Sequence, residues 1–209
     1  MATPEGLGHV DIGGERRLAT RGDPVYGEPT RDGWRVWAPG RSKVAAMLEH
    51  DLPVELDDET VVLYLGAGAG TTVSHLADIC AVVYAVEFAP RPARQLVEVA
   101  TGRQNVIPLL KDARRPDSYA HVVESGCDLL VQDVATRGQA EVAIANRQFL
   151  DDDGQLVLSI KARSEDVVAE PESVFTSVLE QLEETYTIEA TADPTPFHTD
   201  HLGVLARPR

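Results

Sequence analysis

From Thr60 onward, short apolar runs alternate with stretches in which apolar residues recur at helical spacing. The runs are not broken by polar residues, which is typical of strands buried on both faces of a sheet. In a later stretch, Val174, Val178 and Leu182 fall on one face of a helix. We therefore expect strands at 61–65, 81–86, 105–110, 128–133 and 155–160, and helices at 71–77, 90–100, 118–124, 139–150 and 171–184.

The last two apolar runs have no helix between them. Residues 185–190 and 202–205 read as strands, and their direct connection predicts that they run antiparallel as neighbours or near-neighbours. Five strand–helix units closed by such a pair predict an α/β fold. Its sheet should be doubly wound, mostly parallel and seven-stranded, with one reversed strand near an edge.

The first 59 residues follow a different pattern, with alternating polarity and many turn residues. Residues 9–19 alternate on either side of Gly13-Gly14, as in a β-hairpin, and residues 34–37 form a further alternating strand. Ser42 is placed to cap a short helix over 43–50. We therefore divide the chain into a small β-rich N-terminal subdomain, 1–59, and a main domain, 60–209.

A glycine-rich turn follows the first strand of the main domain. Gly66, Gly68 and Gly70 occupy alternate positions, and without Cβ atoms the backbone can turn sharply and approach a ligand. Thr71 or Thr72 is expected to cap the next helix, whose free N–H groups would face that ligand. The spacing is G-x-G-x-G, whereas dinucleotide sites have G-x-G-x-x-G. A tight turn without a ligand is the alternative at this point.

Polar residues stand at the ends of the other strands. Glu87 ends the second strand, where a carboxylate can accept hydrogen bonds from both hydroxyls of a ribose. Asp112, Asp133 and Lys161 stand at the ends of the third, fourth and fifth strands. Because the carboxyl ends of parallel strands meet at one edge of a sheet, we expect these side chains and Gly66 to line one crevice that holds a nucleoside cofactor. Solvated loop residues are the alternative.

The charge balance limits what the surface can bind. The net charge is −15, and of the 19 basic residues only Lys43, Lys111 and Lys161 are lysine. An acidic, lysine-poor surface is typical of proteins that work in molar salt, so we expect a salt-accumulating source; an ordinary acidic cytosolic enzyme is the alternative. In either case the balance argues against a protein that grips nucleic acid through a broad basic face.

The remaining sequence features favour a cytoplasmic location. No apolar run approaches the roughly 18 residues of a membrane span, and residues 1–5 lack the regions of a signal peptide. Cys80 and Cys127 each lie at the edge of an apolar strand, as is typical of buried thiols in a reducing cytosol. His198, Asp200 and His201 match no usual ligand spacing, so we expect no metal site.

Five segments of the chain are more specific than the glycine spacing alone. They are Arg41–Ala46, Tyr64–Asp78 (YLGAGAGTTVSHLAD), Val83–Arg91 (VYAVEFAPR), Asp128–Ala140 and Ser159–Ser164 (SIKARS). Together they resemble the fibrillarin family, the methyltransferase subunit of box C/D guide-RNA particles, and the likeness extends over nearly the whole chain. Because no glycine/arginine-rich tail is present, the chain is similar to the shorter archaeal form of the family.

The resemblance implies the sheet of S-adenosylmethionine-dependent methyltransferases, that cofactor, and 2′-hydroxyls of ribosomal and transfer RNA as acceptors. It also implies as partners a box C/D guide RNA, a coiled-coil scaffold protein and a kink-turn-binding protein. The family usually has glutamine where this chain has Thr136, and Gln139 is close enough in sequence to substitute. The cofactor contacts implied by position are Gly66, Ala67, Gly68, Thr71, Thr72, Glu87, Phe88, Asp112, Ala113, Asp133, Val134, Ala135, Thr136 and Gln139.

The Lys-Asp-Lys-His tetrad of the family falls on Lys43, Asp133, Lys161 and His201. In general a lysine accepts a proton only when burial or nearby cations lower its pKa. We assign Lys161 as the proton acceptor and Asp133 as the residue that orients it, with Lys43 and His201 as electrostatic or RNA-positioning groups. Arginine keeps its proton, whereas lysine can lose it. That an arginine-rich chain has lysine at tetrad positions 43 and 161 therefore fits a need for a neutral amine at one of them. Chance placement of the lysines is the alternative.

Three other functions are compatible with parts of the pattern. The same sheet serves methyltransferases of small molecules, and the chain could also be a cofactor-binding structural subunit without catalytic activity. A nicotinamide dehydrogenase is disfavoured by Thr71 in place of the third glycine and by the terminal strand pair. Because so acidic a chain offers few charges to phosphates, we expect guide RNA and scaffold proteins to place the substrate RNA.

Overall fold

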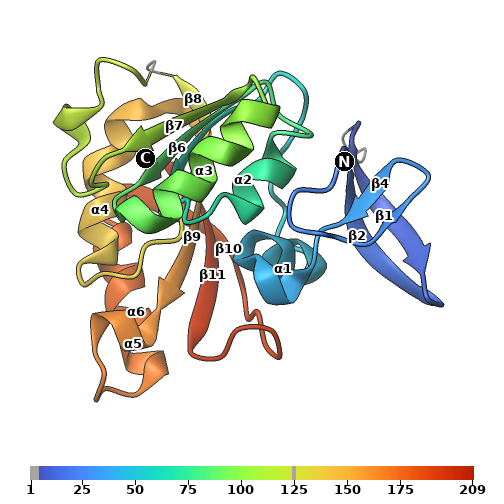
Figure 1. Cartoon of the computed structure of the whole chain (residues 1–209). Helices are drawn as coiled ribbons and strands as arrows, with labels where there is room; N and C mark the ends of the chain where they lie inside the picture. The colour runs from blue at the N-terminus through green and yellow to red at the C-terminus, as the bar shows by residue number, and fades with distance from the viewer. Residues whose placement is uncertain (1–4, 124–125) are drawn as a thin grey trace.

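A seven-stranded sheet forms the centre of the protein (Figure 1). The computed structural model describes residues 5–123 and 126–209. The strands from β5 to β9 are parallel, whereas β11 runs antiparallel to both β9 and β10. This confirms the expected mostly parallel sheet with a reversed strand next to one edge. The order across the sheet is β10 (Tyr186–Ala192), β11 (His201–Pro208), β9 (Leu150–Lys161), β8 (Cys127–Gln132), β5 (Val61–Leu65), β6 (Val82–Glu87) and β7 (Val106–Leu110).

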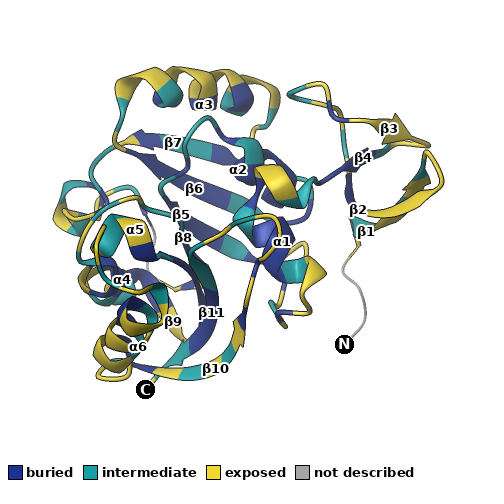
Figure 2. Cartoon of the chain, turned by 90° about the horizontal axis from the view of Figure 1, so that it is seen from below, coloured by how far each residue is buried: buried dark blue, intermediate teal, exposed yellow. Residues whose placement is uncertain are grey.

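Helices cover both faces of this sheet. In Figure 2 the central strands are mostly dark blue, which marks buried residues. In β5, Val62 and Tyr64 face the core under α1 (Lys43–Glu49), α2 (Thr71–Leu76) and α3 (Pro90–Gly102). Leu63 and Leu65 face the opposite core, under α4 (Gln139–Asn146) and α6 (Pro171–Leu182). Because neither face meets water, every position is apolar, which explains the unbroken runs in the sequence. Within the described ranges no helix is long and apolar enough to cross a bilayer.

Three stretches differ from their expected secondary structure. In place of a helix over 118–124, the chain forms η2 (Pro116–Ser118) and turns at 119–123, and Glu124 lies outside the described residues. Tyr119 is fully buried and donates its hydroxyl hydrogen to the Asn146 side chain, which draws the segment into the core. β9 starts earlier than expected because Leu150 pairs with Cys127, so α4 ends in η3 (Arg147–Phe149). The short helix α5 (Ala162–Glu165) was not expected.

The start of α2 also differs from the expectation. Gly70, and not Thr71 or Thr72, is the N-cap residue, with a φ of 85° that glycine adopts without strain. The Thr72 hydroxyl is buried and instead donates to Ser42 Oγ at 2.9 Å. Ser42 caps α1 as expected, because its Oγ accepts the Ala45 N–H at 3.2 Å. One buried oxygen therefore joins the first turns of α1 and α2.

The N-terminal residues form a separate antiparallel sheet, drawn in blue in Figure 1. The predicted hairpin is confirmed, with Gly13 and Gly14 at φ values of 66° and 84°. The predicted boundary at residue 59 stays a prediction; α1 precedes that boundary but packs in the core of the large sheet. The strand order is β1 (Leu7–Ile12), β2 (Glu15–Arg21), β4 (Trp34–Val36) and β3 (Thr30–Arg31), with η1 (Pro39–Arg41) leading into α1.

A buried charged cluster attaches this sheet to α2 and the loop that follows it. The Arg35 side chain is fully buried; its Nε lies 2.7 Å from Asp78 Oδ2 and its Nη1 lies 3.3 Å from Glu28 Oε1. Arg103 donates to the other oxygen of Asp78 at 3.1 Å. Ions removed from water are tolerated only when they are paired and hydrogen-bonded. The cluster therefore holds the small sheet in one position against the large one.

Candidate active site

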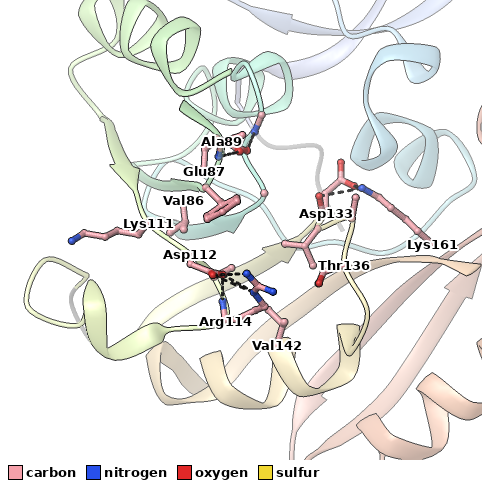
Figure 3. Close-up of a pocket in the computed structure, with 16 residues that line it drawn as sticks. Val86, Glu87, Ala89, Lys111, Asp112, Arg114, Asp133, Thr136, Val142 and Lys161 are labelled. Carbon is pink, nitrogen blue, oxygen red and sulfur yellow. Dashed lines mark hydrogen bonds and ion pairs between the residues drawn. The ribbon is translucent and has the colours of Figure 1, made fainter. Parts of the chain in front are cut away.

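A cavity of about 600 Å³ opens at the carboxyl ends of the parallel strands (Figure 3). The five residues expected to share a crevice, Gly66, Glu87, Asp112, Asp133 and Lys161, all line it. They come from the ends of β5, β6, β7, β8 and β9 in turn, as the topology requires. The other lining residues are Gly68, Val86, Phe88, Ala89, Lys111, Ala113, Arg114, Val134, Ala135, Thr136 and Val142.

The glycine turn forms one wall of the cavity. Gly66 has a φ of 84°, and a Cβ there would lie 2.5 Å from the carbonyl oxygen of Asp133. Only glycine fits this position, since both the conformation and the space exclude a side chain. The N–H groups of Gly66 and Ala67 both donate to the Val86 carbonyl, at 2.9 Å and 3.0 Å. The turn is thereby bound to the end of β6.

Glu87 fixes the same turn through its carboxylate. Its Oε2 accepts the Gly68 N–H at 2.7 Å, and its Oε1 accepts the Ala89 N–H at 2.6 Å. The side chain is therefore held in one direction at the cavity wall, where Figure 3 shows its bond to Ala89. A carboxylate oxygen has more than one lone pair, so each oxygen can still accept a ligand hydroxyl.

Asp112 and Phe88 form the outer lip of the cavity. Arg114 donates to both oxygens of Asp112, with Nη2 at 2.7 Å from Oδ2, and this hydrogen bonding holds the pKa of Asp112 below its ordinary value. The guanidinium of Arg114 also lies 6.0 Å from the centre of the Phe88 ring, which is largely exposed. Arg114 was not among the residues predicted from the sequence; its place two residues after Asp112 is the signal that could have identified it.

Asp133 lies between two lysines at the other end of the cavity. Lys43 Nζ is 3.1 Å from Asp133 Oδ2, and Lys161 Nζ is 2.8 Å from Asp133 Oδ1. Lys161 Nζ also donates to the Asp133 main-chain carbonyl at 3.3 Å. Lys43 reaches this position from the first turn of α1, and Lys161 from the last residue of β9. Three predicted tetrad residues are thus in direct contact.

His201 stands beside this group without joining the carboxylate. It is the first residue of β11 and pairs directly with Lys161 across the strands. Its Nδ1 lies 2.6 Å from the Thr199 carbonyl oxygen. Burial lowers the pKa of His201, and the charges of Lys43 and Lys161 act in the same direction. The imidazole is therefore neutral at neutral pH.

Four predicted contact residues do not line the cavity. Ala67 is turned into the core, and Thr71 lines a smaller cavity beside Glu28 and Arg41. The Thr72 hydroxyl is bound to Ser42. Gln139, expected to substitute at the place of Thr136, is fully buried with its side-chain amide on the backbone of Lys161, whereas Thr136 itself lines the cavity.

The arrangement fits a nucleoside. The fixed carboxylate of Glu87 suits ribose hydroxyls, and the apolar surfaces of Ala113, Val134 and Val142 suit a purine ring. Gly66 and Gly68 present backbone where a side chain would block the approach. At the opposite end, Asp133 is paired with the amines of Lys43 and Lys161.

Comparisons with known proteins agree with this geometry. The family profile described as Fibrillarin matches residues 4–209. The fibrillarin-like rRNA/tRNA 2′-O-methyltransferase of Halorubrum lacusprofundi is 62% identical over 206 residues, which are 99% of this chain and 97% of that protein. Relatives of similar identity come mostly from salt-loving archaea, as the acidic composition predicted.

Solved structures of the family match over nearly the whole chain. The chain matches one in a crystal structure of a fibrillarin/Nop5p complex with a TM-score of 0.92 and 40% identity, over 100% of both chains. It matches Aeropyrum pernix fibrillarin, crystallised with natively bound S-adenosyl-L-methionine, with a TM-score of 0.86 and 39% identity, over 96% of this chain and 94% of that one. By sequence and by fold, this chain belongs to the fibrillarin family.

Proposed function

We propose that this chain transfers a methyl group from S-adenosylmethionine to 2′-hydroxyls of ribosomal and transfer RNA, as the catalytic subunit of a box C/D guide-RNA particle. The observation that carries the proposal is the Lys43–Asp133–Lys161 group at the rim of a cavity built over a glycine turn. The names of its relatives, which are rRNA/tRNA 2′-O-methyltransferases, support the same activity.

Residues along the cavity would hold the cofactor. Glu87 binds the ribose, and Phe88, Asp112 and Ala113 contact the base at the outer lip. Gly66 and Gly68 lie in the glycine turn and let the cofactor come close to the backbone. Ala67, Thr71 and Thr72 contribute the backbone of the same turn and of the start of α2. Asp133, Val134, Ala135 and Thr136 follow the end of β8 along the floor. The bound cofactor supplies a sulfonium methyl group that is already activated for displacement.

The tetrad residues then act on the acceptor ribose. Most of the rate comes from alignment, because well-oriented reactants need little further activation. Lys161 first releases its own proton to solvent and, as the neutral amine, accepts the proton of the 2′-hydroxyl. General-base assistance of this kind contributes about 10²–10⁴-fold to a rate. Asp133 holds Lys161 in position. Lys43 and the neutral His201 flank the site, where they position the RNA backbone.

The surface of the chain does not place the RNA by itself. A net charge of −15 leaves few cations for phosphates, and at about 1 M salt the screening length is only ~3 Å. A guide RNA therefore selects the target, and a coiled-coil scaffold protein and a kink-turn-binding protein hold the parts together. The Nop5p complex formed by a 40% identical fibrillarin supports the scaffold contact. We place this particle in the cytoplasm.

Reconstitution tests the proposal directly. The chain is combined with a guide RNA, the scaffold protein, the kink-turn-binding protein and a complementary target RNA, and methylated riboses are mapped. We expect one methylated ribose at the position that the guide specifies, and none without the guide. Site-specific methylation by the isolated chain would contradict the placement by partners, and cofactor binding without methylation in the full particle would favour a non-catalytic subunit.

A further inference from the structure

The backbone of Lys161 extends beyond the end of the neighbouring parallel strand. The last partners in the β8–β9 pair are Gln132 and Leu158. Lys161, the last residue of β9, faces His201 of β11 on its other side. Its N–H and carbonyl on the β8 side need partners, because an unpaired buried backbone group costs about as much as a lost hydrogen bond.

The side chain of Gln139 supplies both partners. Its Oε1 accepts the Lys161 N–H at 2.9 Å, and its Nε2 donates to the Lys161 carbonyl at 3.1 Å. Gln139 is fully buried. A side-chain amide carries a donor and an acceptor in one plane, as a peptide group does. Gln139 therefore takes the place of the strand residue that β8 does not provide.

Gln139 is itself fixed on both sides. Its own N–H and that of Gly138 donate to the carboxylate of Glu165, at 2.5 Å and 2.9 Å. Its carbonyl accepts a hydrogen bond from Gln132 Nε2 at 2.7 Å. The backbone of Gln139 is thus fixed at the beginning of α4, and its side-chain amide holds the end of β9 in a fixed position relative to α4.

We propose that Gln139 is a positioning residue that sets the direction of the Lys161 side chain toward Asp133. The two hydrogen bonds fix the backbone of Lys161, and the backbone fixes the path of its side chain to the contact at 2.8 Å with Asp133 Oδ1. Loss of the amide leaves the lysine present but misplaced, and a misplacement of about 1 Å can cost about 10²-fold in rate. The effect on rate rests on the proposed function; the effect on Lys161 does not.

The first test replaces Gln139 by methionine, which has similar length but neither donor nor acceptor. Gln155→Met is the matched control, because Gln155 is also buried on β9 and bonds the backbone of Glu55 and Pro53, in the middle of the strand and away from Lys161. Methylation by the reconstituted particle gives kcat and KM, and titration of the full chain with S-adenosylmethionine gives its Kd. Gln139→Asn, which keeps an amide but is one methylene shorter, serves if the methionine variant folds poorly.

We expect Gln139→Met and Gln139→Asn to lower kcat at least tenfold while the Kd for the cofactor changes less than twofold. In a Lys161→Met background the same changes should cause no further loss of kcat, since they act through that lysine. Gln155→Met should keep kcat. A raised Kd for S-adenosylmethionine would make Gln139 a cofactor contact and overturn the proposal. An unchanged kcat in the Gln139 variants would also overturn it. So would a double variant whose loss of kcat is the product of the losses in the Gln139 variant and in Lys161→Met.

The second test needs no activity. The chain has three lysines, Lys43, Lys111 and Lys161, so the acylation rate of each amine can be followed by mass spectrometry. Lys111 points away from the cavity in Figure 3 and serves as the internal reference. We expect Gln139→Met to raise the labelling rate of Lys161 several-fold relative to Lys111, and Gln155→Met to leave it unchanged. An unchanged ratio in Gln139→Met would overturn the proposal even if the particle proved inactive.

Discussion

Asp133 binds two ammonium groups with the two oxygens of one carboxylate, and the two lysines come from distant parts of the chain. Lys43 comes from α1, ahead of the first strand of the main sheet, and Lys161 from the end of β9. The carboxylate therefore aligns residues that are far apart in the chain. Of lysine and arginine, only lysine can pair with Asp133 and also lose a proton, because a guanidinium retains its own.

The substitution Lys161→Arg tests that distinction. Arginine keeps the positive charge and can still pair with Asp133, but it cannot accept the hydroxyl proton. We expect the methylation rate of the reconstituted particle to fall by about 10²-fold or more, in line with loss of a general base. The Kd for S-adenosylmethionine, measured on the same protein, should stay within a few-fold. A rate close to that of the unmodified chain would remove the general-base role from Lys161.

At the scale of elements, one buried hydroxyl oxygen, Ser42 Oγ, is hydrogen-bonded to both α1 and α2. This contact fixes the position of Lys43, the first residue of α1, relative to the glycine turn that precedes α2. Ser42 Oγ accepts both the Ala45 N–H and the Thr72 hydroxyl. Burial raises the pKa of the nearby Tyr64 hydroxyl, which also interacts with the Thr72 side chain and with the charge of Asp133. The hydroxyl of Thr72 is therefore part of the support for the site.

Replacement of Thr72 by valine removes that hydroxyl and keeps the shape of the side chain. We expect the free energy of unfolding to fall by about 1 kcal/mol, because Ser42 loses a buried hydrogen bond. Denaturant unfolding measures this change, and Thr72→Ser, which retains the hydroxyl, is the control. If the valine variant and the unmodified chain have equal free energies of unfolding, the Ser42–Thr72 hydrogen bond contributes nothing to stability.

The cluster that attaches the small sheet also makes the fold sensitive to acid. His75 lies in it, stacked on Trp37 with ring centres 5.1 Å apart and hydrogen-bonded to Thr20. Burial, with the charges of Arg35 and Arg103, lowers the pKa of His75 to about 2. The folded chain therefore keeps this imidazole neutral at a pH where the unfolded chain protonates it.

The sign of the effect follows from that difference. Below a pH of about 6.5, the unfolded state binds a proton that the folded state does not, so His75 lowers the free energy of unfolding as pH falls. The slope contributed is about 1.4 kcal/mol per pH unit. His75→Gln should lose this contribution, which denaturant titrations between about pH 7 and pH 5 can measure. If both proteins show the same slope, the pKa of His75 is not lowered.

The elements that the sequence predicted correctly are those with a local signal. Unbroken apolar runs identified β5 to β9, Gly13-Gly14 identified the hairpin, and Ser42 identified the start of α1. The strand ends then located the cavity, because the position of Asp133 or Lys161 in a parallel sheet follows from topology.

The features that the sequence did not predict depend on distant partners. Thr72 reads as a helix cap until Ser42 is seen beside it, and nothing local to Gln139 shows that its amide bonds the backbone at the end of β9. Nothing local to Arg35 shows that Asp78 and Glu28 surround it in the fold. Such contacts arise only after the sheet has brought separate segments together.

At the scale of the whole molecule, the acidic surface determines the conditions in which the fold is stable. A net charge of −15 means that exposed carboxylates repel one another. Salt reduces this repulsion, because the screening length falls from about 10 Å at 0.1 M to ~3 Å at 1 M. The Arg35–Asp78–Arg103 pairs are buried, so salt affects their attraction much less.

Thermal unfolding with and without concentrated KCl tests this account. We expect the melting temperature to rise with KCl, because screening removes repulsion while the buried pairs are kept. Sucrose at matched viscosity is a control for effects that do not depend on charge. Equal melting temperatures in dilute and concentrated KCl would contradict the account and favour an ordinary acidic enzyme.

The reversed strand β11 has a consequence for how the protein is made. Its first residue, His201, lies opposite Lys161, and its strand separates β10 from β9 within the sheet. Chains emerge from the ribosome starting at the amino end, so the cofactor wall is synthesised well before β11 is available to pair with β9. Until β11 inserts, a nascent chain already contains Lys43, Asp133 and Lys161 but lacks His201 and the strand that pairs with the end of β9, so this edge of the site is completed last.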